Sequence, residues 1–472
     1  MLRTLHDLTR DANALKSQGK IGAAIEIYKQ AVRQFPTSAV ALHNLAAAYG
    51  DAGNYVDAER VAGMAIQAGL NAAETWLVRG RARFGLNDFA GAETAYREAI
   101  ARQPDAAAAR MELAQLLWMR SGDREQALKA VETPDGSDTP QEAFFGFLKA
   151  QVLEHMEETQ AALALILPLV VKPGYSSRLR APMLAFASQL AAQTGDAPGA
   201  VALAEQAVRL AEPGDPGALE AEVRALIAAG EGEKASAAAA RLLRLNPDNQ
   251  RFIAIQATAW RLAGDPRYST VYDYQNLVRT AMIAVPATWP SLDAYLADLA
   301  VELKQAHPFR AHPFGHSVRQ GSQKSDVLSV PTRAISVFVE AITPPINAFL
   351  DSMGQGSDPL RSRRRDSAQM IGNWSVWLRP GGHHADHVHP DGWMSSACYI
   401  ELPPAVNAGG REGWLRFGKP GIPAGGNLQA EHWVQPKPGL LALFPSYMWH
   451  GTEPFGGTEP RLTIAFDLVP NG

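Results

Sequence analysis

Small residues that recur with a fixed period constrain the fold more than any other feature of the sequence. Alanines return at intervals of 34 residues in two parallel sets. The sets are Ala24, Ala58 and Ala92, and Ala31, Ala65 and Ala99. Small side chains at helical spacing let two helices approach closely, and a period of this length is typical of stacked helical hairpins. The sequence therefore predicts an array of paired helices that bury their apolar faces against one another.

Larger residues occupy matching positions between the alanines. Tyr28 and Tyr96 each follow an alanine of the first set by four residues, and Trp76 and Gly80 open the third unit. These residues resemble the tetratricopeptide repeat, and looser units extend the resemblance to residue 264. The resemblance implies a superhelix whose concave surface binds a peptide or protein. Packing against the rest of the same chain, or dimer formation, is the alternative role for such an array.

The composition changes after residue 264, where Pro, Gly, Trp and Phe become frequent. Short apolar segments bounded by Gly or Pro predict an antiparallel sandwich or barrel. They are MIGNWSVWL, MSSACYIELP, GWLRFG, LLALFP and RLTIAFDLV. We expect an α+β multidomain chain, with an all-α repeat superhelix at 1–264. A jelly-roll domain, or double-stranded β-helix, with supporting helices near its start is expected at 265–472.

Histidines concentrate in the segment PGGHHADHVHPDGW, which spans residues 380–393. His387 and His389 are two residues apart, so both face the same side of an extended segment. His450 follows a later strand, and a barrel can bring it to the same ion. Three histidines on one face of a metal, with the other positions open, predict a metal site for catalysis.

A basic residue with a hydroxyl neighbour lies shortly after the third histidine. Arg461 opens the last predicted strand, and Thr463 falls on the same face two residues later. An arginine in this setting is suited to clamp a carboxylate through paired hydrogen bonds. We therefore expect Arg461 and Thr463 to bind a carboxylate ligand.

The order of these motifs over roughly 368–470 resembles the iron(II)/2-oxoglutarate-dependent oxygenases of the prolyl-hydroxylase-like superfamily. The resemblance implies an Fe(II)- and 2-oxoglutarate-dependent dioxygenase, with Fe(II) as metal and 2-oxoglutarate as cosubstrate. It places the metal ligands at His387, His389 and His450. It places the cosubstrate contacts at Arg461, Thr463, Tyr399 and Asn373.

The metal motif departs from the family pattern, in which one of the three ligands is a carboxylate. The sequence reads His-x-His here, so three neutral imidazoles would leave the charge of Fe(II) uncompensated. Two His-x-Asp matches also occur, His384 with Asp386 and His389 with Asp391. We expect His387 and His389 to be ligands, and Asp391 is the alternative.

Two other functions stay open at this point. A cupin-type metalloenzyme shares the G-x5-H-x-H spacing but leaves Arg461 without a role. A non-catalytic scaffold with a degenerate oxygenase domain would account for the missing carboxylate. If the chain is a hydroxylase, a protein or peptide docked by the repeats is the expected substrate.

Global composition excludes several classes of protein. A net charge of −4 over 472 residues argues against a nucleic-acid or membrane-surface binder. The single cysteine, Cys398, excludes an internal disulfide framework. No run of about 18 apolar residues occurs, and the N-terminus lacks a secretory signal. We expect a cytoplasmic protein that binds no nucleic acid and no membrane, and the sequence leaves its oligomeric state open.

Overall fold

The computed structural model describes residues 3–134, 136, 138–172 and 174–471. Its contacts group the chain into two compact units. One unit is Met1–Trp118 with Gly122–Val152, and the other is Met119–Ser121 with Leu153–Gly472. The helical array ends at Ala263, next to the predicted end at 264, but its later helices share a compact unit with the strands. The boundary between the compact units thus lies after Val152, well before the change in composition at residue 264.

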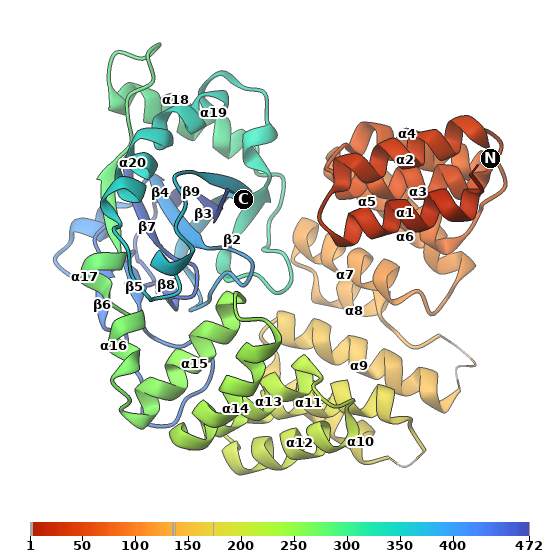
Figure 1. The fold of residues 1–472 in the computed structure, drawn as a ribbon, viewed down its shortest axis with the longest axis horizontal. Helices are drawn as coiled ribbons and strands as arrows, with labels where there is room; N and C mark the ends of the chain where they lie inside the picture. Colours follow the sequence, from red (N-terminus) through yellow and green to blue (C-terminus); the bar gives the residue numbers. More distant parts are fainter. Residues whose placement is uncertain (1–2, 135, 137, 173, 472) are drawn as a thin grey trace. The chain divides into compact units, whose positions relative to one another are not determined.

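The first unit is built from helical hairpins (Figure 1). The six periodic alanines are 0% exposed, as expected for contacts between paired helices. A Cβ atom added at Gly80 would lie 2.5 Å from Cε1 of Tyr96, so this pair of small and large residues is tightly matched. The helices are α1 (Leu5–Ser17), α2 (Ile21–Gln34), α3 (Ala39–Asp51), α4 (Tyr55–Gln67), α5 (Ala73–Gly85), α6 (Phe89–Arg102), α7 (Ala107–Ser121), α8 (Arg124–Ala130) and α9 (Thr139–His155).

Local signals set where these helices begin and turn. Asn54 and Asp88 cap α4 and α6, because their side chains accept hydrogen bonds from backbone N–H groups of the first turn. Gly53 precedes the cap of α4 with φ of 73°, a left-handed conformation that favours glycine. Cap and turn residues therefore fix the hairpin register that the alanine spacing predicted.

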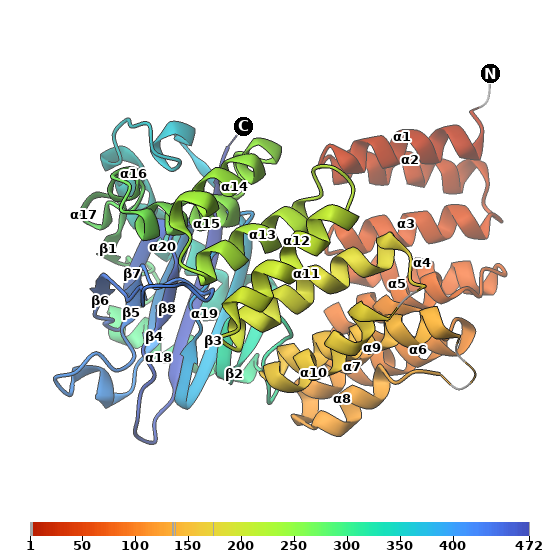
Figure 2. The ribbon, with the colours of Figure 1, turned by 90° about the horizontal axis from the view of Figure 1, so that it is seen from below.

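The second unit continues with further hairpins and then changes character (Figure 2). In this unit α11 to α15 lie side by side as successive helices, and α16 to α20 are interspersed with the strands. Among the described residues, no helix has both the length and the apolar character that crossing a membrane requires. The helices are α10 (Thr159–Val171), α11 (Ser177–Gln193), α12 (Ala197–Leu210), α13 (Pro216–Ala228), α14 (Gly232–Leu245), α15 (Gln250–Ala263), α16 (Arg267–Val271), α17 (Tyr274–Leu277), α18 (Leu292–Gln305), α19 (Arg333–Ser336) and α20 (Phe338–Ser352).

The strands form two sheets, a larger one of order β1-β7-β4-β9-β3-β2 and a smaller one of order β6-β5-β8. All neighbouring strands are antiparallel. The five predicted strand segments appear as β3, β4, β5, β7 and β9, whereas the other four strands in the described part of the chain were not predicted from the sequence. The strands are β1 (Arg279–Met282), β2 (Val318–Ser325), β3 (Ala368–His384), β4 (Met394–Glu401), β5 (Leu415–Phe417), β6 (His432–Val434), β7 (Leu440–Pro445), β8 (His450–Thr452) and β9 (Arg461–Pro470).

The larger sheet buries both faces, each against a different layer. On its outer face Phe466 packs edge-on against Phe338 of α20, with ring centroids 6.5 Å apart. On its inner face Phe444 of β7 meets Phe417 of β5 in the smaller sheet, with centroids 5.0 Å apart. The predicted jelly-roll with supporting helices is therefore confirmed, and the space between its two sheets is where a site can form.

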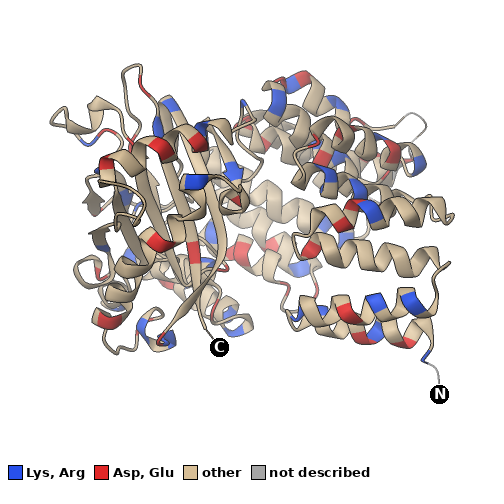
Figure 3. Cartoon of the chain, turned by 90° about the horizontal axis from the view of Figure 1, so that it is seen from above, with Lys and Arg blue, Asp and Glu red and all other residues tan. Residues whose placement is uncertain are grey.

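Charged residues of both signs are distributed along the helices and strands (Figure 3). The sequence contains 44 Lys and Arg against 48 Asp and Glu, so neither sign dominates. Any strong local field must therefore arise from burial and pairing at particular sites, not from net charge.

Candidate active site

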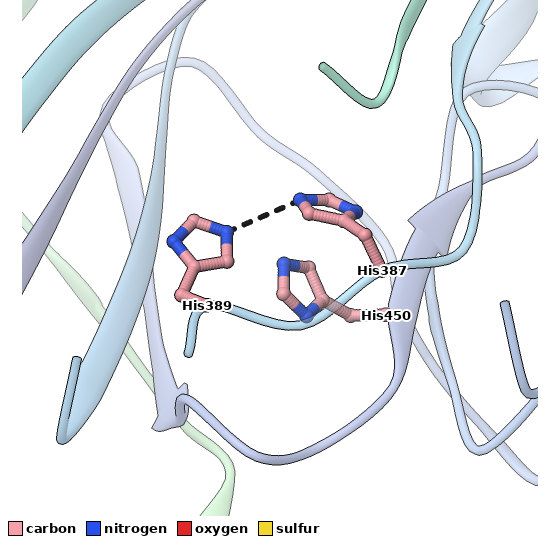
Figure 4. Close-up of side chains that lie close together, drawn as sticks. All are labelled: His387, His389 and His450. Atoms are coloured by element: carbon pink, nitrogen blue, oxygen red, sulfur yellow. Dashed lines mark hydrogen bonds between the residues drawn. The ribbon is translucent and has the colours of Figure 1, made fainter. Parts of the chain in front are cut away.

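The three predicted ligands converge between the two sheets (Figure 4). His387 and His450 face each other in an isolated antiparallel bridge, with N–H···O distances of 2.9 and 3.0 Å between their backbones. His389 follows two residues later, and its N–H donates to the carbonyl of Ser446 at 3.1 Å. One nitrogen from each of the three rings lies within 4.8 Å of the others. The backbone pairing therefore brings the three imidazoles to one point.

Hydrogen bonds fix which nitrogen of each ring faces inward. Each Nδ1 lies within hydrogen-bond distance of an oxygen that can only accept, so each Nδ1 carries the proton and leaves the Nε2 lone pair free. The distances are 2.9 Å from His387 to Ala385 O, 2.9 Å from His450 to Met448 O, and 2.6 Å from His389 to Asp467 Oδ2.

The cluster has the chemistry of a cation site. Nε2 of His387 and Nε2 of His389 are 3.1 Å apart, so a proton or a metal ion is needed between their lone pairs. Burial lowers the pKa of His387 to about 3, and burial also holds the pKa of His450 well below its usual range. Both rings are therefore neutral near pH 7, which is the form that binds metal. The residues present thus fit a divalent ion held by imidazole nitrogens.

Asp467, which sequence reasoning did not assign to the site, holds one of the ligands in place. Its Oδ2 accepts from His389, and its Oδ1 accepts from the Ser395 hydroxyl at 2.7 Å. Trp374 stacks on the other side of the His389 ring, with centroids 5.4 Å apart. The signal that could have found Asp467 is its even spacing from Arg461 along β9, which puts both side chains on one face.

The alternative carboxylates lie outside the cluster of three. Asp391 is exposed and lines the cavity beside the histidines. Both oxygens of Asp386 are engaged by Arg416, at 2.8 Å from Nε and 2.8 Å from Nη2. Asp386 is therefore held in an ion pair. The Ser317 hydroxyl lies 2.9 Å from Nδ1 of His384 and 3.2 Å from Nε2 of His387.

Arg461 is buried without a carboxylate partner. It is 2% exposed, and its Nε and Nη1 have no hydrogen-bond partner among the described residues. Its guanidinium carbon lies 5.2 Å from the ring centroid of Tyr399. Tyr399 and Thr463 are direct cross-strand partners of β4 and β9. The structure thus brings Arg461, Thr463 and Tyr399 together on the inner face of the larger sheet.

Small side chains lie between Arg461 and the histidines on the inner face of the larger sheet. Ser395 pairs with Asp467 and Tyr399 with Thr463, and the residue between the serine and the tyrosine on β4 is Ala397. Ala397 and Ala465 are partly exposed, although the residues that flank them along both strands are buried. Small side chains in mid-sheet therefore leave space on the face that carries Asp467 at one end and Arg461 at the other.

Asn373 lies elsewhere, contrary to its expected place in the cosubstrate pocket. Its side-chain oxygen accepts from the N–H of Leu328 at 2.9 Å, in the 3-10 turn η1 (Val327–Ser329). Its strand neighbour Trp374 faces His389, and adjacent residues of a strand face opposite sides. Asn373 therefore holds a loop on the outer face, and sequence alone did not distinguish the two faces of β3.

A cavity of about 680 Å³ opens beside the histidines. One side of it is formed by the loop before β2 and by the segment that carries His387 and His389. The other side is formed by repeat helices of the same compact unit, including Gln189 of α11, Arg224 of α13 and Arg251 of α15. Repeat and strand regions therefore share one cavity.

The last repeat helix also touches both segments that carry the histidines. The backbone N–H of Gln250, at the start of α15, donates to the carbonyl of Pro390 at 3.0 Å. Trp449 Nε1 donates to the Thr258 hydroxyl at 2.8 Å, in a buried contact. Pro390 and Trp449 are the immediate neighbours of His389 and His450, so α15 helps to position two of the three ligands.

Comparison with known families agrees with this division of the chain. Residues 372–467 match the family model described as "Putative 2OG-Fe(II) oxygenase". Residues 15–81 and 77–138 match two models of the tetratricopeptide repeat. These matches cover the strands with the histidine cluster and the first helical hairpins.

One curated relative and two solved repeat structures are each similar to part of the chain. The heat-shock protein cognate (HSC) co-chaperone sgt12 of Aspergillus fumigatus is 32% identical over 93 residues, which are 20% of this chain and 27% of that protein. The chain thus spans about a quarter of the length of this curated relative. The first repeat domain of Spaghetti (RPAP3), solved with an HSP90 peptide, is 26% identical with a TM-score of 0.23, over 24% of this chain and 90% of that one. A tetratricopeptide repeat protein from Parabacteroides merdae is 14% identical with a TM-score of 0.37, over 54% and 98%.

Proposed function

Because the chain carries a 2OG-Fe(II) oxygenase domain at its C-terminal end and tetratricopeptide repeats at its N-terminal end, we propose that it is an Fe(II)- and 2-oxoglutarate-dependent dioxygenase. When bound, iron and 2-oxoglutarate together use dioxygen to hydroxylate a C–H bond, with 2-oxoglutarate converted to succinate and CO2. The protein would hold these groups, orient the substrate and exclude water.

In this proposal His387, His389 and His450 hold the iron through Nε2. The missing carboxylate ligand is offset by Asp467, because a carboxylate hydrogen-bonded to a ligand imidazole raises the basicity of the metal-binding nitrogen. Negative charge is thereby placed one hydrogen bond away from the ligand sphere instead of within it. The His-x-His motif is for this reason compatible with an active site.

The observation that carries the proposal is the unpaired, buried guanidinium of Arg461. Burying a charged group without a partner costs several kcal/mol of folding free energy. An ion pair with a bound ligand would offset that cost. A dicarboxylate bound over the partly exposed Ala397 and Ala465 would supply the partner, with Thr463 and Tyr399 beside it. The cupin alternative gives Arg461 no ligand, and a degenerate scaffold gives no reason to keep it buried and unpaired.

We further propose that the substrate is a protein or peptide. Tetratricopeptide repeats form concave binding surfaces. The first repeat domain of Spaghetti (RPAP3) has been solved with an HSP90 peptide, and the second repeat domain of human RPAP3 with an HSP70 peptide. In this chain Gln189, Arg224 and Arg251 of the later repeats line the same cavity as His387 and His389. A polypeptide held by the repeats would thus be presented to the oxidising centre.

The direct test is conversion of 2-oxoglutarate to succinate by the full chain loaded with Fe(II), without added substrate. We expect slow succinate formation that requires both Fe(II) and dioxygen and that disappears in His450→Ala. Succinate formation at the same rate in wild type and His450→Ala, or none from wild type that binds Fe(II), would contradict the proposal.

A further inference from the structure

The proposed function leaves open which peptides are accepted, and the cavity wall opposite the histidines bears on this point. We propose that Arg251 of α15 and Asp391 select the substrate by charge: Arg251 binds an acidic side chain of the peptide and Asp391 a basic one. The inference rests on the proposed oxygenase function and names the substrate class for that site.

Arg251 presents a guanidinium that the protein itself neutralises poorly. Its side chain is 47% exposed, and the one ion pair that it forms within the described part of the chain is a long contact of 3.9 Å with Glu220. Glu220 also lies 3.4 Å from Arg224, so its charge is shared between two arginines. Arg251 therefore retains most of its capacity for a paired contact with an incoming carboxylate.

The other arginines that line the cavity are engaged. Arg224 is 19% exposed and contacts Gln189 at 3.3 Å as well as Glu220. Arg319 pairs with Glu157 and is 23% exposed. Among the arginines that line the cavity, Arg251 is thus the most exposed and the most weakly paired.

Asp391 is the corresponding charge on the strand side, and it forms no ion pair with the residues that the structure describes. It is exposed, whereas the other carboxylates on that side are engaged, Asp386 by Arg416 and Asp467 by His389. Asp391 follows Pro390, whose carbonyl accepts from the first residue of α15. The same contact brings the chain segments of Arg251 and Asp391 together, so one weakly paired cation and one exposed anion line the cavity.

A peptide suits this arrangement better than a small molecule. Pockets for small ligands are mostly apolar with a few polar groups, whereas charged and polar side chains surround this cavity on both sides. The walls come from repeat helices and from the ligand-bearing loop, so a chain lying between them passes the histidines. Charged side chains spaced along such a chain would set its register against Arg251 and Asp391.

The test uses three pools of degenerate peptides with blocked ends, enriched in Asp and Glu, in Lys and Arg, or in neutral residues. Binding to the full chain is measured by fluorescence anisotropy, and stimulation of succinate formation is measured in parallel. We expect both charged pools to bind at least about tenfold more tightly than the neutral pool, as charged hydrogen bonds allow. Arg251→Glu should lose the preference for acidic peptides and gain one for basic peptides, and Asp391→Lys should do the reverse.

Arg209→Glu is the matched control, because Arg209 is an exposed arginine of α12 whose contact is a 3.7 Å pair with Glu205 outside the cavity. A reversed preference cannot arise from misfolding, so it separates recognition from loss of structure. Equal binding of the three pools, equal effects of Arg251→Glu and Arg209→Glu, or stimulation by free amino acids alone would overturn the inference. Charge-selective binding without any succinate formation would instead reject the proposed function and leave the binding site standing.

Discussion

His389 donates from Nδ1 to Oδ2 of Asp467 over 2.6 Å, although 78 residues separate the two in sequence. The contact joins the ligand-bearing loop to the last strand of the larger sheet. It orients the imidazole and places a carboxylate next to a ligand set that contains none. The consequence is that metal affinity should depend on a residue that does not touch the metal.

Asp467→Asn keeps the shape and an acceptor oxygen but removes the charge. We expect metal affinity to fall about 10- to 100-fold, the range found when such supporting partners are changed. Titration of the apoprotein with Co(II), followed by its visible absorption, measures the effect. Asp351→Asn is the control, because Asp351 is exposed on α20. Equal affinities in all three proteins would show that Asp467 plays no part in metal binding.

Arg461→Met removes the guanidinium while keeping a long side chain in the buried position. We expect 2-oxoglutarate binding to be lost and Co(II) binding to be retained, since Arg461 is proposed to contact the cosubstrate alone. Arg461→Lys should restore binding only partly, because an ammonium cannot form the paired contact of a guanidinium. Isothermal titration of 2-oxoglutarate into the metal-loaded variants is the measurement. Unchanged affinity in Arg461→Met would remove this residue from the cosubstrate site.

Thr258→Val tests the link between the last repeat helix and the ligand His450. The substitution leaves buried Nε1 of Trp449 without its acceptor, at a cost of about 1–3 kcal/mol in the free energy of unfolding. We expect weaker Co(II) binding and a changed absorption spectrum, whereas Thr258→Ser keeps the hydroxyl and should behave as wild type. Loss of stability with an unaltered spectrum would limit Thr258 to a packing role.

Stability should fall in mild acid because of buried His307. Burial lowers its pKa to about 4, and both ring nitrogens meet serine hydroxyls, Ser322 at 2.8 Å and Ser375 at 3.0 Å. The unfolded chain, with a pKa near its ordinary value of about 6.5, binds the proton first as pH falls. The contribution of His307 to the free energy of unfolding is thus fully present above about pH 6.5. It is lost as the pH falls toward 4, by at most about 3 kcal/mol. Urea unfolding of wild type and His307→Asn between these pH values should show a shallower slope for the variant.

Two glycines in helices of the first unit predict opposite responses to alanine. A Cβ at Gly80 would lie 2.5 Å from the Tyr96 ring, whereas at Gly63 the nearest atom is Nη2 of Arg79 at 3.9 Å. We expect Gly80→Ala to destabilise by about 1–3 kcal/mol through overpacking. Gly63→Ala should stabilise by about 0.5–1 kcal/mol because alanine favours the helix. Thermal unfolding of both variants provides the comparison, and equal midpoints would contradict the assigned packing.

Sequence periodicity was sufficient to predict the helices and strands whose residue pattern is local. The alanine period predicted the hairpins, and alternating apolar residues predicted five strands. Even spacing predicted that His387 and His389 face one side, and the order of motifs in the family that the chain resembles pointed to His450 and Arg461. These features depend on neighbours in sequence, or on motif order, and both can be read directly.

Contacts between distant segments could not be read in the same way. Strand order decides that Asp467 meets His389, and the choice of face on β3 decides that Trp374, not Asn373, lines the site. β2 was not predicted because its residues, VRQGSQKS, lack apolar alternation, although half of them are buried. The engagement of Asp386 by Arg416 likewise removes a carboxylate that spacing alone left as a possible ligand.

The hydrogen bonds from Gln250 and to Thr258 have an evolutionary consequence. Repeat arrays commonly gain and lose units, because each unit contacts only its neighbours. In this chain α15 cannot be gained or lost in this way. Its deletion or replacement would leave Pro390 O and Trp449 Nε1 unpaired beside two histidines. Homologues should therefore vary in repeat number toward the N-terminus while α15 keeps its length, its start and its threonine.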